Sequence, residues 1–411
     1  MKWDLVVIGG GAAGFFGAIQ VATKHPALKV LILEKTSKLL TKVRISGGGR
    51  CNVTYDCKNP YELARHYPRG AKPLKGMFRE FHNDHISDWF EARGVKLKTE
   101  RDGRRFPVSD NSKTIIDCFM EEARRLGIRV NTSTPVAAVN QQSGGFRVSI
   151  ADGSAVEVKR ILITTGGNSH REAYDWISGL GHTIISPVPS LFTFNDRDKH
   201  YRDLMGISVS DAEVKIVGTR LAKRGPVLIT HWGLSGPAVI TLSAWSAEYL
   251  HRENYQFEVL VNWTGGVGEQ EVKKSLLEYK EKYGKQVVST NPMFVIPQRL
   301  WQRLCRMAEI DEAKRWNEMS QRSLNKLTEF VIRCPFQIQG KTTFKEEFVT
   351  CGGVDLNEID LNTMESKRIS GVYFAGEVLH IDGETGGFNF QAAWTTAYLA
   401  AQGITTSLAD G

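Results

Sequence analysis

Short, continuous apolar runs alternate with longer amphipathic stretches over the first 34 residues. Residues 2–8, KWDLVVI, form one such run, and a glycine cluster and an amphipathic stretch to about Lys24 come after it. A second run, KVLILE, ends at Glu34. Short β-branched runs are typical of buried parallel strands, and a period near 3.6 is typical of a helix. The pattern predicts a strand–helix–strand unit.

Similar apolar runs return later in the chain. ILITTGG (161–167) and SGVYFAGE (370–377) each predict a strand that ends in a glycine turn. GETGGFNFQAAWTTAYLAAQ (383–402) predicts a loop whose glycines open a long apolar helix. Strands and helices from both ends of the chain therefore predict an α/β fold.

The pattern changes between about Ser190 and Gly340. LFTFND, ISVSDAEVKIVG, GPVLITHW and YQFEVLVNW alternate as antiparallel strands do. Three helix-like stretches come next, EQEVKKSLLEYKEKYG, PQRLWQRLCRMAEI and SLNKLTEFVIR, and FQIQG (336–340) predicts a strand returning to the β unit. We predict an inserted β-barrel-like domain that carries a small helical subdomain.

Composition narrows the class of protein. A chain of 411 residues predicts two or three domains, and 41% hydrophobic with 24% charged residues is ordinary for a globular protein. Six cysteines without CxxC or Cys/His metal spacing predict no metal site and favour the reducing cytoplasm. No apolar run reaches about 18 residues, so we expect no membrane span. The apolar start resembles a signal peptide, but Asp4 and the glycine triplet argue against one.

The net charge of +8 attracts polyanions. Nucleic acid is one candidate and a phosphate-bearing cofactor is another. The basic residues are scattered along the chain, which weighs against a nucleic-acid partner.

The glycine cluster fits G-x-G-x-x-G as Gly9-Gly10-Gly11-Ala12-Ala13-Gly14. Gly9 allows the tight turn, Gly11 lets a pyrophosphate touch the backbone, and Gly14 lets the helix pack on the strand. The helix N-terminus supplies N–H groups and partial positive charge to phosphate. Glu34, about 20 positions further on, suits a ribose hydroxyl. The motif in this context predicts a dinucleotide site rather than a glycine-rich turn that binds nothing.

The C-terminal segments favour FAD over NAD as this dinucleotide. FAD is long, and its ribityl chain and ring must be held beyond the pyrophosphate. Glu377 suits a ribityl hydroxyl or a water-bridged phosphate, and a helix opening near Gly387-Phe388-Asn389 would aim its N–H groups at the pyrimidine edge of the flavin. The alternative is that these are ordinary turns of a doubly wound sheet.

Six motifs carry a resemblance to a known family: VIGGGAAG, SGGGRCNVT, DGRRFPVSD, THWGLSGPAV, TCGGVDL and FAGEVLHIDGETGGFNFQAAW. The chain resembles the BaiN/YhiN-like flavoproteins, which include aminoacetone oxidases and have a glutathione-reductase-type FAD fold. The resemblance covers nearly the whole chain and implies bound FAD, with oxidation of a small substrate or of NAD(P)H. By motif match it assigns to the cofactor Gly9, Gly11, Gly14, Glu34, Arg50, Cys51, Asn52, Val136, Thr165, Gly166, Gly376, Glu377, Gly387, Phe388 and Asn389.

The candidate cofactor set also takes in neighbours of these residues, namely Ala12, Ala13, Lys35, Lys42, Gly48, Gly49 and Gly386. Two positions depart from the family pattern, since Cys351 stands where alanine is expected and His380 where an acidic residue is expected. Both lie beside predicted flavin segments, so the substrate is not carried over from the family.

The stretch SGGGRCN holds three consecutive glycines, Gly47 to Gly49, which we expect against FAD between the pyrophosphate and the ring. Arg50 would neutralise phosphate or lock the loop, since its fork matches two oxygens. The alternative for Arg50, Lys42 and Arg44 is a solvated basic loop.

Disulfide reductases of this fold carry CxxxxC at a similar place, but five residues separate Cys51 from Cys57. The pair is not superimposable on that motif, so a packing role for Cys51 is favoured over a redox dithiol.

A second strand–glycine–helix stretch, LVNWTGGVGEQE (260–271), lacks the G-x-G-x-x-G spacing and has no acidic strand end after it. We therefore predict no second dinucleotide site, and any nicotinamide would dock transiently.

With FAD as the predicted cofactor, the chain divides into five segments. Residues 1–190 and 341–411 form the Rossmann-like FAD-binding domain, 191–262 the inserted β-rich domain, 263–332 the helical subdomain, and 333–340 the return strand of the β-rich domain.

Catalytic candidates are few, because hydride transfer at flavin N5 needs mainly position and electrostatics. His231 suits a general acid or base, although a structural role before an apolar strand is the simpler alternative. His380 is a candidate proton carrier. Arg105, with Arg104, suits an anionic substrate or a plain surface turn. We expect the substrate between the insertion and the flavin face.

The leading hypothesis is a cytoplasmic FAD-dependent oxidoreductase that acts on a small molecule, with NAD(P)H as a transient co-substrate. A tRNA-modifying flavoprotein and a flavin-binding sensor or structural protein with little turnover are the alternatives. The substrate, the choice among NADH, NADPH and oxygen, and the oligomeric state stay open.

Overall fold

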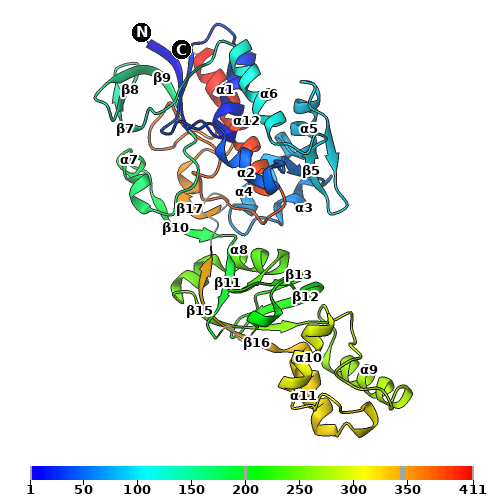
Figure 1. The fold of residues 1–411 in the computed structure, drawn as a ribbon. Helices are drawn as coiled ribbons and strands as arrows, with labels where there is room; N and C mark the ends of the chain where they lie inside the picture. The colour runs from blue at the N-terminus through cyan, green and yellow to red at the C-terminus, as the bar shows by residue number, and fades with distance from the viewer. Residues whose placement is uncertain (1, 199–200, 343–348, 410–411) are drawn as a thin grey trace. The chain divides into compact units, whose positions relative to one another are not determined.

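The computed structural model describes residues 2–198, 201–342 and 349–409, and the chain divides into two compact units. The Rossmann unit takes Met1–Ser190 and Lys345–Gly411, and the barrel unit takes Leu191–Phe344. Figure 1 shows the first and last segments of the chain, blue and red, together in the Rossmann unit. The finer division of the sequence into five segments stays a prediction.

The main sheet of the Rossmann unit has seven strands in the order β6-β2-β1-β9-β8-β7, with β18 also pairing β9. The pairs among β6, β2, β1, β9 and β18 are parallel, whereas β7, β8 and β9 form an antiparallel meander. The strands are β1 (Lys2–Ile8), β2 (Val30–Leu33), β6 (Arg129–Asn131), β7 (Val136–Gln142), β8 (Gly145–Ile150), β9 (Ala155–Ile163) and β18 (Val372–Phe374). A strand from the C-terminal segment therefore extends the sheet begun by the N-terminal one.

Helices α1 (Ala12–Lys24) and α12 (Phe388–Ala409) pack side by side on this sheet (Figure 1). A Cβ at Gly17 of α1 would lie 2.8 Å from Leu162 of β9 and 3.7 Å from Ala397 of α12, so glycine lets the three elements approach. Most residues of α12 are buried on all sides, as expected for an apolar helix. Helix α6 (Lys113–Arg125) contacts α1 as well.

Smaller elements complete the Rossmann unit. A three-stranded sheet has the order β3-β5-β4, and β10 pairs β17. Their bounds are α2 (Thr41–Gly49), β3 (Thr54–Tyr55), α3 (Pro60–Ala64), α4 (Ala71–Glu80), α5 (Asn83–Glu91), β4 (Leu97–Thr99), β5 (Arg104–Pro107), η1 (Arg171–Tyr174), α7 (Asp175–Ser178), β10 (Ile184–Ser190), β17 (Val349–Val354) and η4 (Leu356–Glu358).

The barrel unit is built on a closed barrel with the strand order β11-β14-β13-β12-β15-β16. Its elements are β11 (Thr193–Asp196), η2 (Arg202–Leu204), β12 (Ser208–Ile216), β13 (Ala222–Ile229), β14 (Gly233–Ser235), α8 (Pro237–Arg252), β15 (Gln256–Asn262), α9 (Glu269–Lys282), α10 (Gln298–Met307), η3 (Trp316–Glu318), α11 (Gln321–Ile332) and β16 (Cys334–Thr342). Apolar residues from barrel and helices share one core that includes Trp263, Trp301 and Trp316.

The predicted fold class, a Rossmann-like α/β fold with an inserted barrel and helices, is confirmed. One prediction was wrong in detail: the apolar stretch after His231 is not a strand. Only Gly233–Ser235 is extended, and α8 begins at Pro237. Proline suits the first position of a helix, and Gly236, with φ +97°, turns the chain into it.

Candidate functional site

The turn between β1 and α1 is shaped by contacts of the chain with itself at two glycines. A Cβ at Gly9, whose φ is +117°, would lie 2.3 Å from the carbonyl oxygen of Thr164. A Cβ at Gly14 would lie 2.0 Å from the carbonyl oxygen of Gly9. Glycine at both positions is therefore required for β1, α1 and the end of β9 to meet.

Gly11 is different, because a Cβ there would meet no atom within 4 Å. It is the N-cap of α1, and no side chain caps this helix end. Ala12 begins the helix and Ala13 is buried in it. The first N–H groups of α1 therefore face open space at Gly11, which suits an anion that comes close to the backbone.

Glu34 comes directly after β2, and its carboxylate fixes the same turn through hydrogen bonds. Its Oε2 accepts a hydrogen bond of 2.9 Å from the Gly10 N–H, and its Oε1 accepts from the N–H and hydroxyl of Thr36. Each carboxylate oxygen has further acceptor capacity for a ribose hydroxyl. Lys35 beside it is exposed.

The SGGGRCN loop is irregular backbone at the end of α2. Gly47, Gly48 and Gly49 all have positive φ, and a Cβ at Gly48 or Gly49 would meet no atom within 4 Å. Such conformations favour glycine, and the space beside two of them is open.

Arg50 locks this loop, which is one of the two roles considered for it. Its Nη1 lies 2.6 Å from Glu100 Oε1, its guanidinium stacks 3.9 Å from the Phe106 ring centre, and its Nε donates to the Gly47 carbonyl oxygen at 3.3 Å. The guanidinium thus contacts carboxylate, ring and backbone of the chain itself.

Cys51 is fully buried, and its burial raises the pKa of the thiol to about 12. The thiolate is the reactive form, so the buried thiol is inert at neutral pH. Cys57 is half-buried and its Sγ lies 3.3 Å from the carbonyl oxygen of Asn59. Neither cysteine is in a disulfide. These contacts favour the packing role of Cys51.

Segment 52–54 is fastened to the start of α12. Trp394 Nε1 donates to the Val53 carbonyl oxygen at 2.9 Å, and the buried Thr54 hydroxyl donates to Gln391 Oε1 at 2.6 Å. A Cβ at Gly387 would lie 2.8 Å from the Thr54 backbone and 2.9 Å from Asn52 Oδ1. That amide oxygen of Asn52 is buried and has no hydrogen-bond partner among the described residues.

The turn after β18 meets the first turn of the chain. A Cβ at Gly376 would lie 2.9 Å from the Ala13 side chain, and the Gly376 N–H donates to Thr396 Oγ1 at 2.9 Å. Glu377 Oε2 lies 2.6 Å from Lys42 Nζ, and Glu377 Oε1 accepts from the Thr350 N–H. Lys42, from α2, and Glu377 are thus brought together.

The loop before α12 is held by Asn389. Its Oδ1 accepts from the Gly383 N–H and its Nδ2 donates to the carbonyl oxygens of Gly383 and Glu384. Gly386 and Gly387 have φ of +132° and +96°. The loop is therefore a fixed, glycine-lined turn.

Five residues of this region were not singled out as site candidates from the sequence. Asp382 is fully buried, and both its oxygens contact the Arg69 guanidinium, while Ser190 Oγ donates to it at 3.0 Å. Burial raises the pKa of Asp382 and the adjacent guanidinium opposes that rise. His66 and Glu384 form a second pair. Both acidic residues lie inside the IDGETGG stretch of the C-terminal motif, which was the available signal.

The remaining candidates lie in three places, and Thr165 is beside the β1–α1 turn, since a Cβ at Gly9 would lie 3.1 Å from the Thr165 Cα. Thr165 and Gly166 come after β9, and a Cβ at Gly166 would meet no atom within 4 Å, whereas Val136 begins β7 opposite Ile150. His380 is half-buried after the turn at Glu377, and its N–H donates to the Val354 carbonyl oxygen.

Two catalytic candidates have contacts that favour the simpler alternatives. Arg105 Nη2 lies 2.6 Å from Asp56 and its Nη1 lies 2.9 Å from Asp84 and 2.8 Å from Ser87 Oγ. Two carboxylates thus compensate the guanidinium of Arg105 within the unit. His231 is exposed on the barrel unit, where its ring packs edge-on against Trp232.

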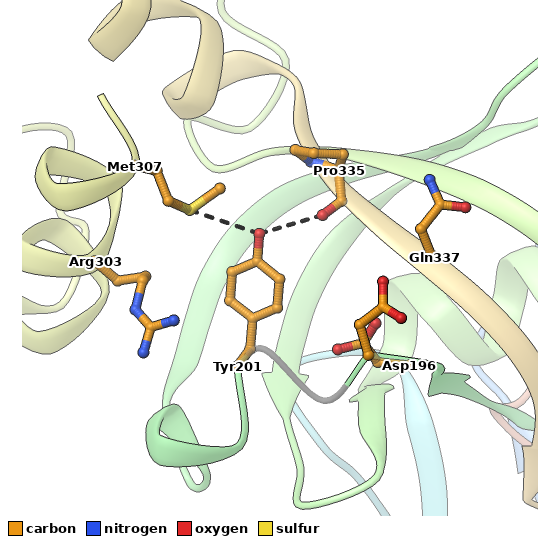
Figure 2. A pocket seen from close by; sticks show the side chains of 7 residues that line it. Asp196, Tyr201, Arg303, Met307, Pro335 and Gln337 are labelled. Atoms are coloured by element: carbon orange, nitrogen blue, oxygen red, sulfur yellow. Dashed lines mark hydrogen bonds between the residues drawn. The ribbon is translucent and has the colours of Figure 1, made fainter. Parts of the chain in front are cut away.

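The barrel unit has a pocket of its own, of about 390 Å³. Figure 2 shows the Tyr201 hydroxyl between Met307 and the carbonyl oxygen of Pro335, with hydrogen-bond distances of 3.7 and 3.2 Å. The pocket is lined by Asp196, Asp198, Tyr201, Arg303, Met307, Pro335 and Gln337. None of the motif residues lines it, so it is separate from the predicted cofactor site.

The Rossmann unit fits a bound dinucleotide. The uncapped N-terminus of α1 and the open space at Gly11 suit a pyrophosphate, and the Glu34 carboxylate suits a ribose. Open glycines at 48, 49 and 166 and the partnerless Asn52 oxygen offer further backbone surface and an acceptor. Over the described part of the chain, no cluster of His, Cys, Asp and Glu is arranged to hold a metal ion, and no helix is long and apolar enough to cross a membrane.

Comparison with known proteins identifies the family. Residues 3–403 match the HI0933-like protein Rossmann domain. The chain belongs to this family. The predicted resemblance to BaiN/YhiN-like flavoproteins is thereby confirmed, and the chain is an FAD-dependent oxidoreductase.

Two kinds of relative match along nearly the full length of both chains. The 3-dehydro-bile acid delta(4,6)-reductase of Clostridium scindens is 25% identical over 96% of this chain and 97% of its own. The ribosomal RNA dihydrouridine synthases of Haemophilus influenzae and Escherichia coli are each 28% identical, over 97% and 98% of this chain and 98% of their own.

Among solved structures, the 3-ketosteroid-delta4-(5alpha)-dehydrogenase of Rhodococcus jostii has a TM-score of 0.51 at 14% identity, over 97% of both chains. A quinol-fumarate reductase also has a TM-score of 0.51 at 14% identity, over 100% of this chain and 72% of its own. These similarities show the fold.

Proposed function

We propose that this protein is an NAD(P)H-dependent reductase that saturates a carbon–carbon double bond conjugated to a carbonyl group. FAD, when bound, would supply the hydride chemistry that links the nicotinamide to the substrate. The chain supplies the binding surfaces, the orientation and the proton.

The observation that carries the proposal is that two different substrates named among the relatives share one reaction. A 3-dehydro-bile acid with Δ4,6 double bonds is a conjugated ketone, and the named relative is a reductase. Dihydrouridine is uridine with its 5,6 double bond saturated, and that bond is conjugated to the C4 carbonyl. In both substrates the carbonyl makes a carbon of the conjugated double bond electrophilic, so we propose that a hydride adds to the carbon β to the carbonyl and a proton adds to the α carbon.

We propose a role at the cofactor for each candidate segment. The N–H groups at Gly11 and the start of α1 bind the pyrophosphate, and Glu34 accepts a hydrogen bond from a ribose. Glu377, fixed by Thr350, binds the ribityl chain or the phosphates, while Lys42 compensates its charge. Gly48, Gly49 and Gly387 let backbone approach the ring.

No second dinucleotide fingerprint supports a fixed nicotinamide site, so NAD(P)H docks transiently and leaves before the substrate binds. A substrate-binding site that first serves the nicotinamide gives ping-pong kinetics.

An anaerobic stopped-flow experiment tests the proposal. The FAD-loaded protein is reduced with NADH or NADPH and then mixed with 2-methyl-2-cyclohexen-1-one, a 3-oxo-4-ene steroid, or aminoacetone. We expect flavin absorbance to bleach with one nicotinamide and to return with the conjugated ketones but not with aminoacetone. Reoxidation by none of the conjugated ketones overturns the proposal.

The second candidate is a reductase that acts on uridine in RNA, and the observation that favours it is the 28% identity to two ribosomal RNA dihydrouridine synthases. The same chemistry applies. Reoxidation of the reduced protein by unmodified ribosomal RNA, with dihydrouridine found by mass spectrometry, supports this candidate. Reoxidation by free conjugated ketones alone supports the small-molecule candidate.

A further inference from the structure

We propose that His66, oriented by Glu384, is the acid that protonates the α carbon of the substrate during the reduction. This inference rests on the proposed function. It concerns two residues that were not catalytic candidates in the sequence analysis.

The first observation is the pairing of the two side chains. His66 Nδ1 lies 2.9 Å from Glu384 Oε2. The two backbones are also joined, since the Glu384 N–H donates to the His66 carbonyl oxygen at 2.9 Å. A carboxylate only accepts hydrogen bonds, so Nδ1 carries the hydrogen and the opposite nitrogen, Nε2, is the one that can exchange a proton.

The second observation is the aromatic ring on which the His66 imidazole stacks. The His66 ring lies parallel to the Phe388 ring, with the centres 4.2 Å apart and the planes 12° apart. Tyr55 packs against both rings, at 5.6 Å from His66 and 4.8 Å from Phe388. Phe388 is itself fixed, because the Tyr67 hydroxyl donates to its carbonyl oxygen at 2.6 Å.

The third observation is the difference in exposure. The Glu384 side chain is 12% exposed, whereas the His66 side chain is 35% exposed. The carboxylate is therefore the buried orienting group and the imidazole is the accessible one. A buried carboxylate that fixes the tautomer of an accessible histidine is the arrangement used in acid–base catalysis.

The fourth observation is the position in the chain. Phe388 begins α12, and Glu384 lies in the glycine loop that Asn389 clamps, which is the segment proposed to meet the pyrimidine end of the flavin. The buried ion pair between Arg69 and Asp382 fixes the same loop. A proton donor here would lie on the segment that we propose contacts the flavin.

The chemistry balances with one proton. The hydride, drawn from NAD(P)H through the flavin that the site would hold, would form a C–H bond at the β carbon. The π electrons of the double bond move toward the carbonyl, giving an enolate. Its α carbon then takes the proton from Nε2 of the His66 imidazolium, which becomes the neutral imidazole with its hydrogen on Nδ1. Water returns the proton to Nε2 after product leaves.

The test compares His66→Gln and Glu384→Gln with a matched control, His25→Gln, which alters a half-buried histidine at the end of α1. Each protein is loaded with FAD, and FAD content, flavin spectrum and melting temperature are measured first. Flavin reduction by NAD(P)H and reoxidation by 2-methyl-2-cyclohexen-1-one are then measured separately. Reactions in D2O report which face of the α carbon receives deuterium.

We expect His66→Gln to keep FAD content, spectrum and reduction rate, and to slow reoxidation by the ketone about a hundredfold. Its product should carry deuterium on both faces of the α carbon, because solvent replaces the fixed donor, and added imidazole should restore part of the rate. Glu384→Gln should slow reoxidation by the ketone about tenfold. His25→Gln should leave that rate unchanged.

A His66→Gln protein that reoxidises at the wild-type rate with the wild-type facial selectivity overturns this inference and leaves the proposed function intact. Loss of FAD or of the reduction step in His66→Gln also overturns it, because the role is then cofactor binding. A wild-type protein that reduces no conjugated ketone or uridine overturns the proposed function and this inference with it.

Discussion

Two turns of this chain are alike in sequence and local shape, one between β1 and α1 in the Rossmann unit and one between β15 and α9 in the barrel unit. Both lead from a strand through glycines into a helix. Both helices have a glycine N-cap, Gly11 or Gly268, without a side-chain cap, and a Cβ at either position would meet no atom within 4 Å.

The two helix ends differ in charge. The first turn of α9 contains Glu269 and Glu271, and Glu269 lies 2.6 Å from both Lys273 and Arg333. The first turn of α1 has no acidic residue. Carboxylates of α9 therefore meet the partial positive charge of its own N-terminus, whereas that of α1 is left for an anion from outside the chain.

The two turns also differ in the elements that come after them. Gly14 lets α1 pack closely against the backbone of the β1–α1 turn. The next strand, β2, pairs with β1, and Glu34 at its end accepts a hydrogen bond from that turn. After α9 the chain continues to α10 without such a strand. The two turns therefore share the glycines before a helix, and only the β1–α1 turn adds an uncompensated helix end and an acidic strand end, which is why we predict a dinucleotide site there alone.

The largest effect should come from Gly14→Ala. The new methyl group would lie 2.0 Å from the Gly9 carbonyl oxygen, so α1 must shift, and we expect the apo-protein to lose about 3 kcal/mol of stability. Urea unfolding measures this loss. Gly268→Ala is the control, with an expected loss below about 1 kcal/mol; equal losses in the two variants would contradict the difference between the turns.

Gly11→Ala should separate binding from folding. Its methyl group enters open space, so apo-protein stability should stay within about 1 kcal/mol of wild type. Affinity for FAD should fall about thirtyfold, or about 2 kcal/mol, because the methyl group meets the pyrophosphate. Titration of the apo-protein with FAD, monitored by flavin fluorescence, measures it. Unchanged affinity would remove Gly11 from the proposed site.

The ion-paired carboxylate at the start of α9 predicts that the stability of the barrel unit depends on pH. Hydrogen bonds from Lys273 and Arg333 lower the pKa of Glu269 from its usual 4.5 to about 2. Because the folded pKa is lowered, this contribution to stability is complete above pH 4.5 and is lost as the pH falls toward 2. A side-chain NMR titration should show the low pKa, and Arg333→Gln should move it upward. A wild-type pKa equal to the usual value would contradict the ion pairs.

The smallest effect should come from Cys57→Ala. This variant tests whether a pair of thiols in the Rossmann unit carries electrons in addition to the flavin. Cys57 is half-buried and Cys51 is an inert buried thiol, so stability should change by less than about 0.5 kcal/mol and turnover not at all. Steady-state turnover with NAD(P)H is the measurement. A loss of activity with FAD retained would revive the dithiol hypothesis.

Local pattern was sufficient for β1, β2, the end of β9 and β18 of the Rossmann sheet and for helices α1 and α12, whereas β6, β7 and β8 were not predicted from the sequence. The run 2–8, the G-x-G-x-x-G spacing and the apolar stretch after Gly387 each specify an element by periodicity or by a glycine that the backbone needs. The stretch after His231 was misread because its apolar residues suit a buried helix as well as a strand, and only Pro237 and Gly236 distinguish the two.

The sequence by itself determined the family, the α/β class with its insertion, and the positions where glycine leaves the backbone open. Each of these follows from residues that are close together along the chain. Only the tertiary structure decided that Arg50 pairs with Glu100, that Arg105 is held by Asp56 and Asp84, and that His66 meets Glu384. These partners are separated by 21 to 318 positions, and a charged side chain takes its role from the charge it meets in space. Residue type and local pattern cannot supply that partner.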